Sequence, residues 1–341
     1  MTQNNEKMNS TVNMPGKEER RTAVENAVKQ IEKDFGVGSI MRLGNRADEN
    51  IDVLSTGILS LDNILGVGGL PRGHIVEIYG PKDSGRTTIA LWCIAQAQKA
   101  GGFAAFIDAE HTLDSKYAEA MGVDIDELYL SQPDNGEQAL GICEALVQSG
   151  AFDIVIVDSV AALVLKREIE QGPGEIYSFE RARLLSQALQ KIDSVIGKTN
   201  TVLVFINLLR EKAGVVYEDS EPTAGGKGLK FYSSVRIEVR NGQLLRDFTD
   251  VIGNRLNIKV AKNKVAPPFK STAVDLIYGK GISAAGDLLE LAVAHNIIKR
   301  TGAWYSYDGN NIARGRENTV ARLEEDKMLF DEIFGKVKVT L

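Results

Sequence analysis

Residues 80–88, which read GPKDSGRTT, match the spacing of a phosphate-binding loop at every defined position but one. In the pattern GxxxxGK[ST], backbone N–H groups at a helix N-terminus surround nucleotide phosphates, the lysine contacts the β and γ oxygens, and the hydroxyl binds Mg²⁺. Gly80, Gly85 and Thr87 occupy the required positions, whereas Arg86 stands in place of the lysine. Arginine keeps the positive charge, but its planar group on a longer stem cannot place one compact charge at the same point. The loop therefore predicts nucleotide binding more strongly than efficient hydrolysis.

Two carboxylates follow strand-like apolar runs and could complete such a site. Asp158 ends the run FDIVIVD, which is typical of an aspartate that helps to hold Mg²⁺. Glu110 lies in FIDAEHTLD, where a carboxylate could orient and deprotonate the water that attacks a γ-phosphate. From the residues alone, a helix-capping or solvent-facing role is an equally good interpretation of Glu110. The three histidines lack the spacing of metal ligands, so nucleotide-bound Mg²⁺ is the only metal that we expect.

The composition predicts a soluble, cytoplasmic protein. Charged residues make up 25% of the 341 positions, and no apolar run reaches the roughly 18 to 20 residues of a membrane span or forms a signal peptide. The formal net charge is −6, so a nucleic-acid partner would need a local basic surface. Cys93 and Cys143 lie in separate apolar helical stretches, and we expect reduced core residues rather than a disulfide or a metal pair.

The elements that must position these residues alternate between strands and helices. Val24, Val28, Ile31 and Phe35 form one face of a helix that Gly36 can end, and this face is either core or a docking surface. Strands are expected at 74–79, 103–107, 154–157 and 202–206, with helices from residue 87 and at 137–149. The alternation predicts a largely parallel sheet with helices on both faces. Closely spaced runs at 235–239, 256–260 and 273–277 extend it with antiparallel pairs, and a hairpin-like WYSYDGNN turn follows.

Several longer blocks occur in order and carry a resemblance to a known family. They are FGVGSIMRLG (35–44), STGILSLDNILGVGGLPRGHIVEIYGP (55–81), FIDAEHTLD (106–114), SQPDNGEQAL (131–140), IVDSVAAL (156–163), LKFYSSVR (229–236), KNKVAPPFK (262–270) and GAWYSYDG (302–309). With these blocks the chain resembles bacterial RecA recombinases over nearly its whole length, from about Ala23 to the C-terminal domain. The resemblance implies an α/β fold: a RecA-like P-loop ATPase core with a mostly parallel central sheet, an N-terminal helix and a small α+β C-terminal domain.

The same resemblance implies how the chain is divided. The expected regions are a disordered tail (1–17), an N-terminal oligomerisation helix and linker (18–46), a RecA-like ATPase core with two DNA-binding loops (47–283) and a small C-terminal domain (284–341).

The resemblance also implies roles for individual residues, with ATP and Mg²⁺ as cofactors. Glu110 matches the general base, Thr87 and Asp158 match the Mg²⁺-associated residues, and Arg86 takes the place of the catalytic cation. The matching ATP-binding loop comprises Gly80, Pro81, Lys82, Asp83, Ser84, Gly85, Arg86, Thr87 and Thr88. Positions that line the adenine pocket are Asp114, Tyr117 and Tyr278, and those that reach the phosphates of a neighbouring protomer's ATP are Lys262 and Lys264.

Two DNA-binding loops are implied at about 168–178 and 209–227. Family positions on or beside them are Arg183, Ser186, Arg210, Lys212, Gly225, Gly226 and Lys227. Cations and exposed N–H groups there suit phosphate oxygens and bind without sequence preference. The implied partners are single-stranded DNA, a homologous duplex, further copies of the chain in a helical filament, and a repressor-type protein of the SOS response, with no membrane.

The chain departs from the family pattern at several of these places. Leu208 replaces a glutamine that senses the γ-phosphate, and a leucine cannot hydrogen-bond to phosphate. Glu211 and Ala213 replace apolar residues of the second loop, and Gln190 replaces an arginine on the helix after the first loop. A working recombinase is our first hypothesis, and a hydrolysis-impaired paralogue that acts as a nucleotide-binding filament or regulatory protein is the second. A RecA-fold kinase or hexameric motor is a third, which the blocks LKFYSSVR and KNKVAPPFK argue against.

Overall fold

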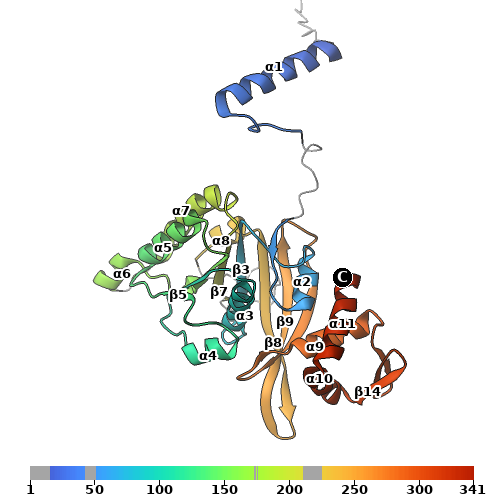
Figure 1. Ribbon diagram of the computed structural model, residues 1–341. Coiled ribbons are helices and arrows are strands. Elements are labelled where there is room, and N and C mark those ends of the chain that lie inside the picture. The colour runs from blue at the N-terminus through green and yellow to red at the C-terminus, as the bar shows by residue number, and fades with distance from the viewer. Residues whose placement is uncertain (1–15, 43–50, 173, 175, 210–224) are drawn as a thin grey trace, which may run out of the picture. The chain divides into compact units, whose positions relative to one another are not determined.

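A computed structural model describes residues 16–42, 51–172, 174, 176–209 and 225–341. The chain divides into two compact units, Met1–Asn50 and Ile51–Leu341 (Figure 1). Arg210 and Lys212, which we expected to contact DNA, and the substituted positions Glu211 and Ala213 lie outside the described residues.

The first unit contains one helix, α1 (Lys17–Phe35), in its described part. It ends where expected, at Gly36, whose φ of 97° lies in the left-handed region and whose N–H donates to Glu32 O. None of its residues is buried, and Phe35 is 79% exposed. Within the described residues of this unit, the apolar stripe of α1 therefore belongs to no core.

The second unit is built on a nine-stranded sheet with the order β11-β10-β9-β8-β3-β7-β6-β4-β5. Its strands are β3 (His74–Gly80), β4 (Ala104–Asp108), β5 (Leu128–Ser131), β6 (Ile154–Asp158), β7 (Val202–Leu208), β8 (Val235–Asp247), β9 (Asp250–Asn263), β10 (Ser271–Ile277) and β11 (Gly281–Ile282). Across the sheet, the neighbouring strands β5, β4, β6, β7, β3 and β8 pair in parallel. The remaining strands, β9, β10 and β11, continue the sheet beyond β8 with antiparallel pairs. This confirms the mostly parallel sheet that the alternation of strands and helices predicts.

Helices cover both faces of the sheet. On one face, α2 (Leu59–Leu65) and α3 (Arg86–Lys99) pack against Val76, Ile78 and their same-face neighbours. On the other, α5 (Gly136–Ser149) and α7 (Ile176–Ile196) pack against alternate residues such as Ile75, together with Leu229 of the short helix α8 (Gly228–Tyr232). Burying both faces explains why these strands are continuous apolar runs rather than alternating ones.

Cys93 and Cys143 are free and fully buried, one in the core of each face, as we expected. Among the described residues, no helix has the length and apolar character needed to cross a membrane.

The first expected DNA loop is wrong in its secondary structure. Helix α6 (Lys166–Gln171) runs into residues 168–171, and α7 begins at Ile176, so most of 168–178 is helical. The segment KREIEQ consists almost entirely of strong helix formers, and Gly172, with φ of 83°, ends it. The hairpin of β8 and β9 is likewise longer than expected, because pairing continues beyond the predicted runs to Asp247 and Asp250.

The remaining short elements are the β1–β2 pair (Val53–Leu54 and Leu70–Pro71) and helix α4 (Ser115–Ala120). The C-terminal segment comprises α9 (Ala284–Ala294), β12 (Lys299–Thr301), β13 (Trp304–Tyr307), β14 (Asn310–Arg314), α10 (Arg316–Glu325) and α11 (Lys327–Thr340). It has its own core around Leu288, Tyr305, Leu323 and Ile333. The expected hairpin is present as β13 and β14, joined at Asp308 and Gly309, both at positive φ.

Two buried carboxylates lie where α2 meets the C-terminal segment. Asp62 accepts hydrogen bonds from Ser55 Oγ, Thr56 N and Thr56 Oγ1 at 2.6 to 2.9 Å. Asp287 on α9 accepts from Ser60 N at 3.1 Å, at the N-terminus of α2. Burial raises the pKa of Asp62 to about 6, against the effect of its hydrogen bonds, and the charge of Asp287 adds to the rise.

This raised pKa predicts a specific pH dependence of stability. Folded Asp62 holds its proton more tightly than unfolded Asp62, so its contribution to the free energy of unfolding falls as pH rises from about 4 to about 7. Asp62→Asn removes this titration. As pH rises across that range, the free energy of unfolding of the variant, measured with urea, should increase relative to that of wild type by roughly 2 to 3 kcal/mol. Asp331→Asn, at an exposed position, is the control. A difference between Asp62→Asn and wild type that is constant with pH would contradict the prediction.

Candidate nucleotide site

The phosphate loop connects β3 to α3, and its glycines are required by the packing around them. A Cβ at Gly80 would lie 2.0 Å from Val239 O, so no side chain fits there. Gly85 caps α3 with φ of 85°. Asp83 also has a positive φ, of 59°, and its carbonyl accepts a hydrogen bond from Asn241 Nδ2 at 2.9 Å. These constraints shape a concave run of backbone at the N-terminus of α3, which suits phosphate oxygens.

Two cavities adjoin this loop. The larger, of about 510 Å³, is lined by residues 82–88, Glu110, Tyr117, Asn241, Gly242, Leu244, Asn254, Leu276 and Tyr278. The smaller, of about 250 Å³, is lined by Thr87, Phe106, Asp108, Thr112, Leu113, Asp114, Tyr117 and Asp158. Among the described residues, Ser84 Oγ is buried here without a hydrogen-bond partner. An unpartnered hydroxyl inside a phosphate loop fits a site that awaits a polar ligand.

The two residues expected to hold Mg²⁺ are in contact. Thr87 Oγ1 donates a 2.7 Å hydrogen bond to Asp158 Oδ2 at the end of β6. Burial raises the pKa of Asp158 to about 6, although the Thr87 hydrogen bond and the charge of Arg86 oppose the rise. In the part of the chain that the structure describes, no group of three or more His, Cys, Asp or Glu side chains is arranged to hold a metal ion by itself. One hydroxyl and one carboxylate fit Mg²⁺, which keeps several waters and binds proteins together with nucleotide phosphates.

Glu110 lies beside this pair and lines the larger cavity. Its backbone is fixed, because Ala109 N and Glu110 N both donate to Asp158 O. Its side chain accepts a short hydrogen bond from Ser159 Oγ. Buried Asp108 accepts from Thr112 N and Leu113 N and so holds the rest of the loop after β4. Sequence reasoning missed Asp108 and Ser159, although both lie in the quoted blocks.

The residues expected to form the adenine pocket all line these two cavities. Asp114 caps α4 by accepting from Lys116 N and Tyr117 N. Tyr117 Oη is 2.6 Å from Thr88 Oγ1 at the start of α3. Tyr278 follows β10, lines the larger cavity and is 55% exposed, so its ring is accessible from solvent.

Arg86 contacts the end of β7. Its Nη1 donates to Asn207 O at 2.5 Å, next to Leu208. Burial lowers the pKa of Arg86, although the charges of Asp158 and Glu110 oppose this. The guanidinium is thus tied to the end of strand β7, shortly before residues 210–224, which lie outside the described residues.

A buried carboxylate on β3, the strand that precedes the phosphate loop, connects three strands. Glu77 on β3 is fully buried and forms a short ion pair with Arg236 of β8. Asn207 Nδ2 of β7 donates to Glu77 Oε1 at 2.8 Å. Arg236 also stacks over the Tyr79 ring, 4.3 Å from its centroid. Sequence reasoning missed this set, and its one signal is a glutamate within the apolar run HIVEIY.

Lys262 and Lys264 are placed differently from the loop residues. Neither lines the two cavities described above. Lys262 Nζ donates to Lys230 O at 2.7 Å and Phe231 O at 3.1 Å, two carbonyls in the last turn of α8. Burial lowers the pKa of Lys262 to about 8, and the charges of Lys264 and Arg236 add to the effect. A site completed by a neighbouring protomer is compatible with this placement, because both lysines lie apart from the chain's own loop.

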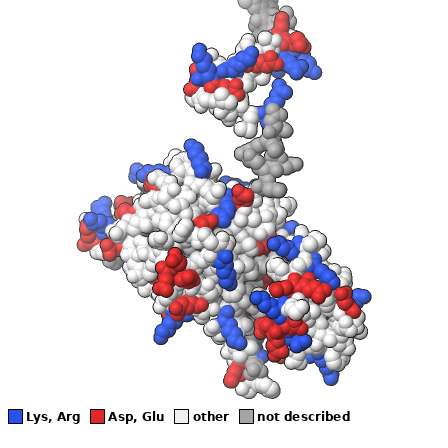
Figure 2. Space-filling view, viewed as in Figure 1, with Lys and Arg blue, Asp and Glu red and all other residues white. Residues whose placement is uncertain are grey.

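The described DNA-loop residues gather around α7. A Cβ on Gly225 would lie 2.7 Å from Leu185 and Val160, and one on Gly226 would lie 3.1 Å from Ala182. Arg183 and Ser186 occur on the same stretch of α7, and Lys227 caps α8. On the face drawn in Figure 2, basic and acidic side chains are interspersed.

The Glu77 set predicts an asymmetric effect on stability. Glu77→Ala should lower the free energy of unfolding by about 3 to 5 kcal/mol, because it leaves Arg236 buried without its carboxylate. Glu77→Leu combined with Arg236→Met should cost less than Glu77→Ala in urea unfolding. Removal of the exposed pair partner Arg322 by Arg322→Ala should cost at most about 1 kcal/mol. If Glu77→Ala costs no more than Arg322→Ala, the ion pair does not hold the strands.

Comparison with known proteins assigns the family. The family model described as RecA N-terminal domain matches residues 22–283, and the model described as RecA C-terminal domain matches residues 286–341. Protein RecA of Macrococcus caseolyticus is 53% identical over 320 residues, which cover 94% of this chain and 91% of that protein. Protein RecA of Latilactobacillus sakei is 54% identical, with the same coverage. Protein RecA of Staphylococcus aureus is 53% identical over 95% of this chain and 93% of its own length. The chain therefore belongs to the bacterial RecA family.

Proposed function

We propose that the protein is a recombinase that binds ATP with Mg²⁺, assembles as a helical filament on single-stranded DNA and pairs that strand with a homologous duplex. The observation that carries this proposal is the contact of Thr87 with Asp158 beneath a phosphate loop, in a chain similar to RecA proteins along most of its length. Recombinational repair, SOS signalling through a repressor-type protein and a cytoplasmic location follow from the same proposal.

The nucleotide would be held by residues of several elements. The N–H groups at the start of α3 would surround its phosphates, and Asp114, Tyr117 and Tyr278 would contact its base. Bound Mg²⁺, held through Thr87 and Asp158, would supply positive charge to the β and γ phosphates. Glu110, oriented by Ser159 Oγ, is placed to accept a proton from water in the larger cavity.

A filament would complete the site that one chain leaves open. We propose that Lys262 and Lys264 reach the phosphates held by a neighbouring copy, so that the nucleotide joins two protomers. The stripe on α1 would supply a second contact between copies, since it is exposed within its own unit. In this proposal, residues 18–46 form an oligomerisation region, 47–283 the ATPase core and 284–341 a C-terminal domain.

DNA binding should be nucleotide-dependent and mainly electrostatic. Fluorescence anisotropy of a labelled oligonucleotide should rise with protein when a slowly hydrolysed ATP analogue and Mg²⁺ are present. Arg183→Ala should lower the affinity and reduce the salt slope by roughly 0.7, as loss of one phosphate contact to a single strand does. Arg322→Ala, on a helix of the C-terminal segment, is the matched control. Absence of analogue-dependent binding by wild type would contradict the proposed function.

The second candidate, a hydrolysis-impaired RecA paralogue, is favoured by one observation. Arg86 directs Nη1 at the carbonyl of Asn207, so one of its donors is already engaged away from the loop. Leu208 beside it offers no polar atom to a phosphate. We propose that this pair slows turnover more than it weakens nucleotide binding.

Arg86→Lys tests this second candidate. The substitution restores a compact ammonium, and DNA-stimulated phosphate release should increase at least about tenfold, which corresponds to ~1.4 kcal/mol of barrier. Nucleotide affinity should change less than the rate. Arg72→Lys, at an arginine paired with Asp153 outside the loop, is the control. Wild-type turnover at a rate typical of ATPases, with no gain from Arg86→Lys, would exclude the impaired paralogue.

A further inference from the structure

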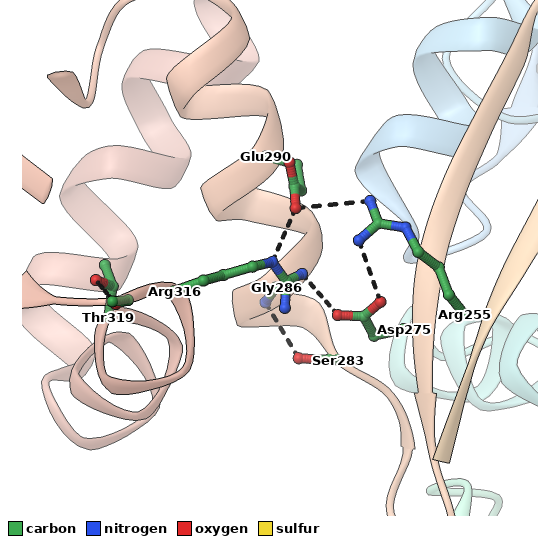
Figure 3. A network of polar contacts seen from close by, with 8 residues as sticks. Arg255, Asp275, Ser283, Gly286, Glu290, Arg316 and Thr319 are labelled. Atoms are coloured by element: carbon green, nitrogen blue, oxygen red, sulfur yellow. Dashed lines mark hydrogen bonds and ion pairs between the residues drawn. The ribbon is translucent and has the colours of Figure 1, made fainter. Parts of the chain in front are cut away.

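Four charged residues form a closed ring between the sheet and the C-terminal segment (Figure 3). Arg316 Nη2 is 2.6 Å from Asp275 Oδ2, and Arg316 Nε is 2.9 Å from Glu290 Oε1. Arg255 bridges the same two carboxylates, with both N···O distances at 3.6 Å. This charge ring, Arg255–Asp275–Arg316–Glu290, joins β9 and β10 to α9 and α10.

The two sheet residues of the charge ring are immediate sequence neighbours of residues that line the nucleotide cavity. Arg255 follows Asn254, and Asp275 precedes Leu276; both of these neighbours line the cavity of about 510 Å³. Tyr278 of the same cavity lies three residues beyond Asp275. Asn254 Nδ2 also donates to Asn241 Oδ1, whose side chain holds the carbonyl of Asp83 in the phosphate loop. A shift of Asp275 or Arg255 would therefore reach both the wall of the cavity and the loop.

The strand that carries this wall lies close to an edge of the sheet. In the described part of the sheet, β11 is the one strand beyond β10, and it pairs with Leu276 and Ile277 over two residues. Asp275 itself is 4% exposed, so its charge must be matched locally, and two arginines supply that match. Arg316 binds it with a planar group that also binds Glu290, which fixes direction as well as distance. The charge ring thus fixes β10 through its side chains, where strand pairing with β11 covers only two residues.

The charge ring is not the sole attachment of the C-terminal segment. Asp287 of α9 accepts from Ser60 N, and Leu59 packs against the C-terminal core. Ser283 N donates to Asp275 O and its hydroxyl caps α9. Loss of Arg316 should therefore loosen the wall of the cavity without releasing the segment.

We propose that the charge ring is a positioning device through which the C-terminal segment sets the affinity of the nucleotide cavity. This rests on the proposed nucleotide binding and extends it, because Arg316 and Glu290 lie outside the cavity lining and belong to the C-terminal segment. Arg316 is a positioning residue: it holds Asp275, and Asp275 holds the end of β10, which carries Leu276 and is followed by Tyr278.

The test measures nucleotide binding without turnover. A fluorescent ATP analogue is titrated with Mg²⁺ into the full-length protein, and hydrogen exchange is followed over residues 274–279 in the nucleotide-free state. Arg316→Ala should weaken binding about five- to thirtyfold, a typical coupling between separate sites, and should speed exchange at the end of β10. Glu290→Gln, at a half-exposed position that threatens folding less, should give a smaller loss in the same direction.

Arg322→Ala is the matched control, because Arg322 lies on the same helix and pairs with Asp326 in solvent. It should leave affinity within about twofold of wild type, as expected for an exposed pair. Wild-type affinity and exchange in both Arg316→Ala and Glu290→Gln would overturn the inference. A wild type that does not bind the analogue at all would overturn the proposed function and this inference with it.

Discussion

The buried carboxylate of Glu77 is the interaction on which the rest of the site depends. A fully buried charge must be paired and hydrogen-bonded, and Glu77 satisfies this by binding Arg236 of β8 and Asn207 of β7 from the middle of β3. These are the strands at the centre of the sheet, where the order changes from β8 on one side to β7 on the other. The loop that follows β3 and the end of β7 therefore share one polar support.

The position of Arg86 follows from that support. Asn207 uses its side chain on Glu77 and its carbonyl on Arg86, so the cation of the phosphate loop is connected to the buried ion pair through one residue. The parallel arrangement of β3, β4, β6 and β7 brings their carboxyl ends to one edge, which is where ligands bind in open α/β sheets. Glu110, Asp158 and Arg86 meet there because each follows one of these strands. An arginine in this place has its direction set by the end of β7 as well as by the loop.

Much of this could be predicted from the sequence, because the signals are local. Gly36 ends a helix after a clear apolar stripe, and the continuous apolar runs mark buried parallel strands. Spacing alone identifies Gly80, Gly85 and Thr87, and the carboxylates follow from their strands. What failed has a different origin. Residues 168–171 were expected in a loop because the family resemblance implies a DNA-binding loop at about 168–178, yet their strong helix propensity prevails.

The contacts that organise the site could not be read from local pattern. Glu77 contacts Asn207, which is 130 positions later in the sequence, and Arg236, which is 159 positions later. Arg316 contacts Asp275 across 41 positions. Lys262 on β9 donates to a carbonyl near the end of α8, 32 positions earlier in the chain. Such pairs depend on which strands become neighbours, and strand order is a property of the whole chain rather than of any segment.

Electron microscopy of the protein with single-stranded DNA and a non-hydrolysable ATP analogue tests the central claim most directly, because it requires nucleotide, DNA and self-assembly together but no turnover. The account predicts open helical filaments that form only when both the analogue and DNA are present. Closed rings or unassembled particles under the same conditions would contradict it.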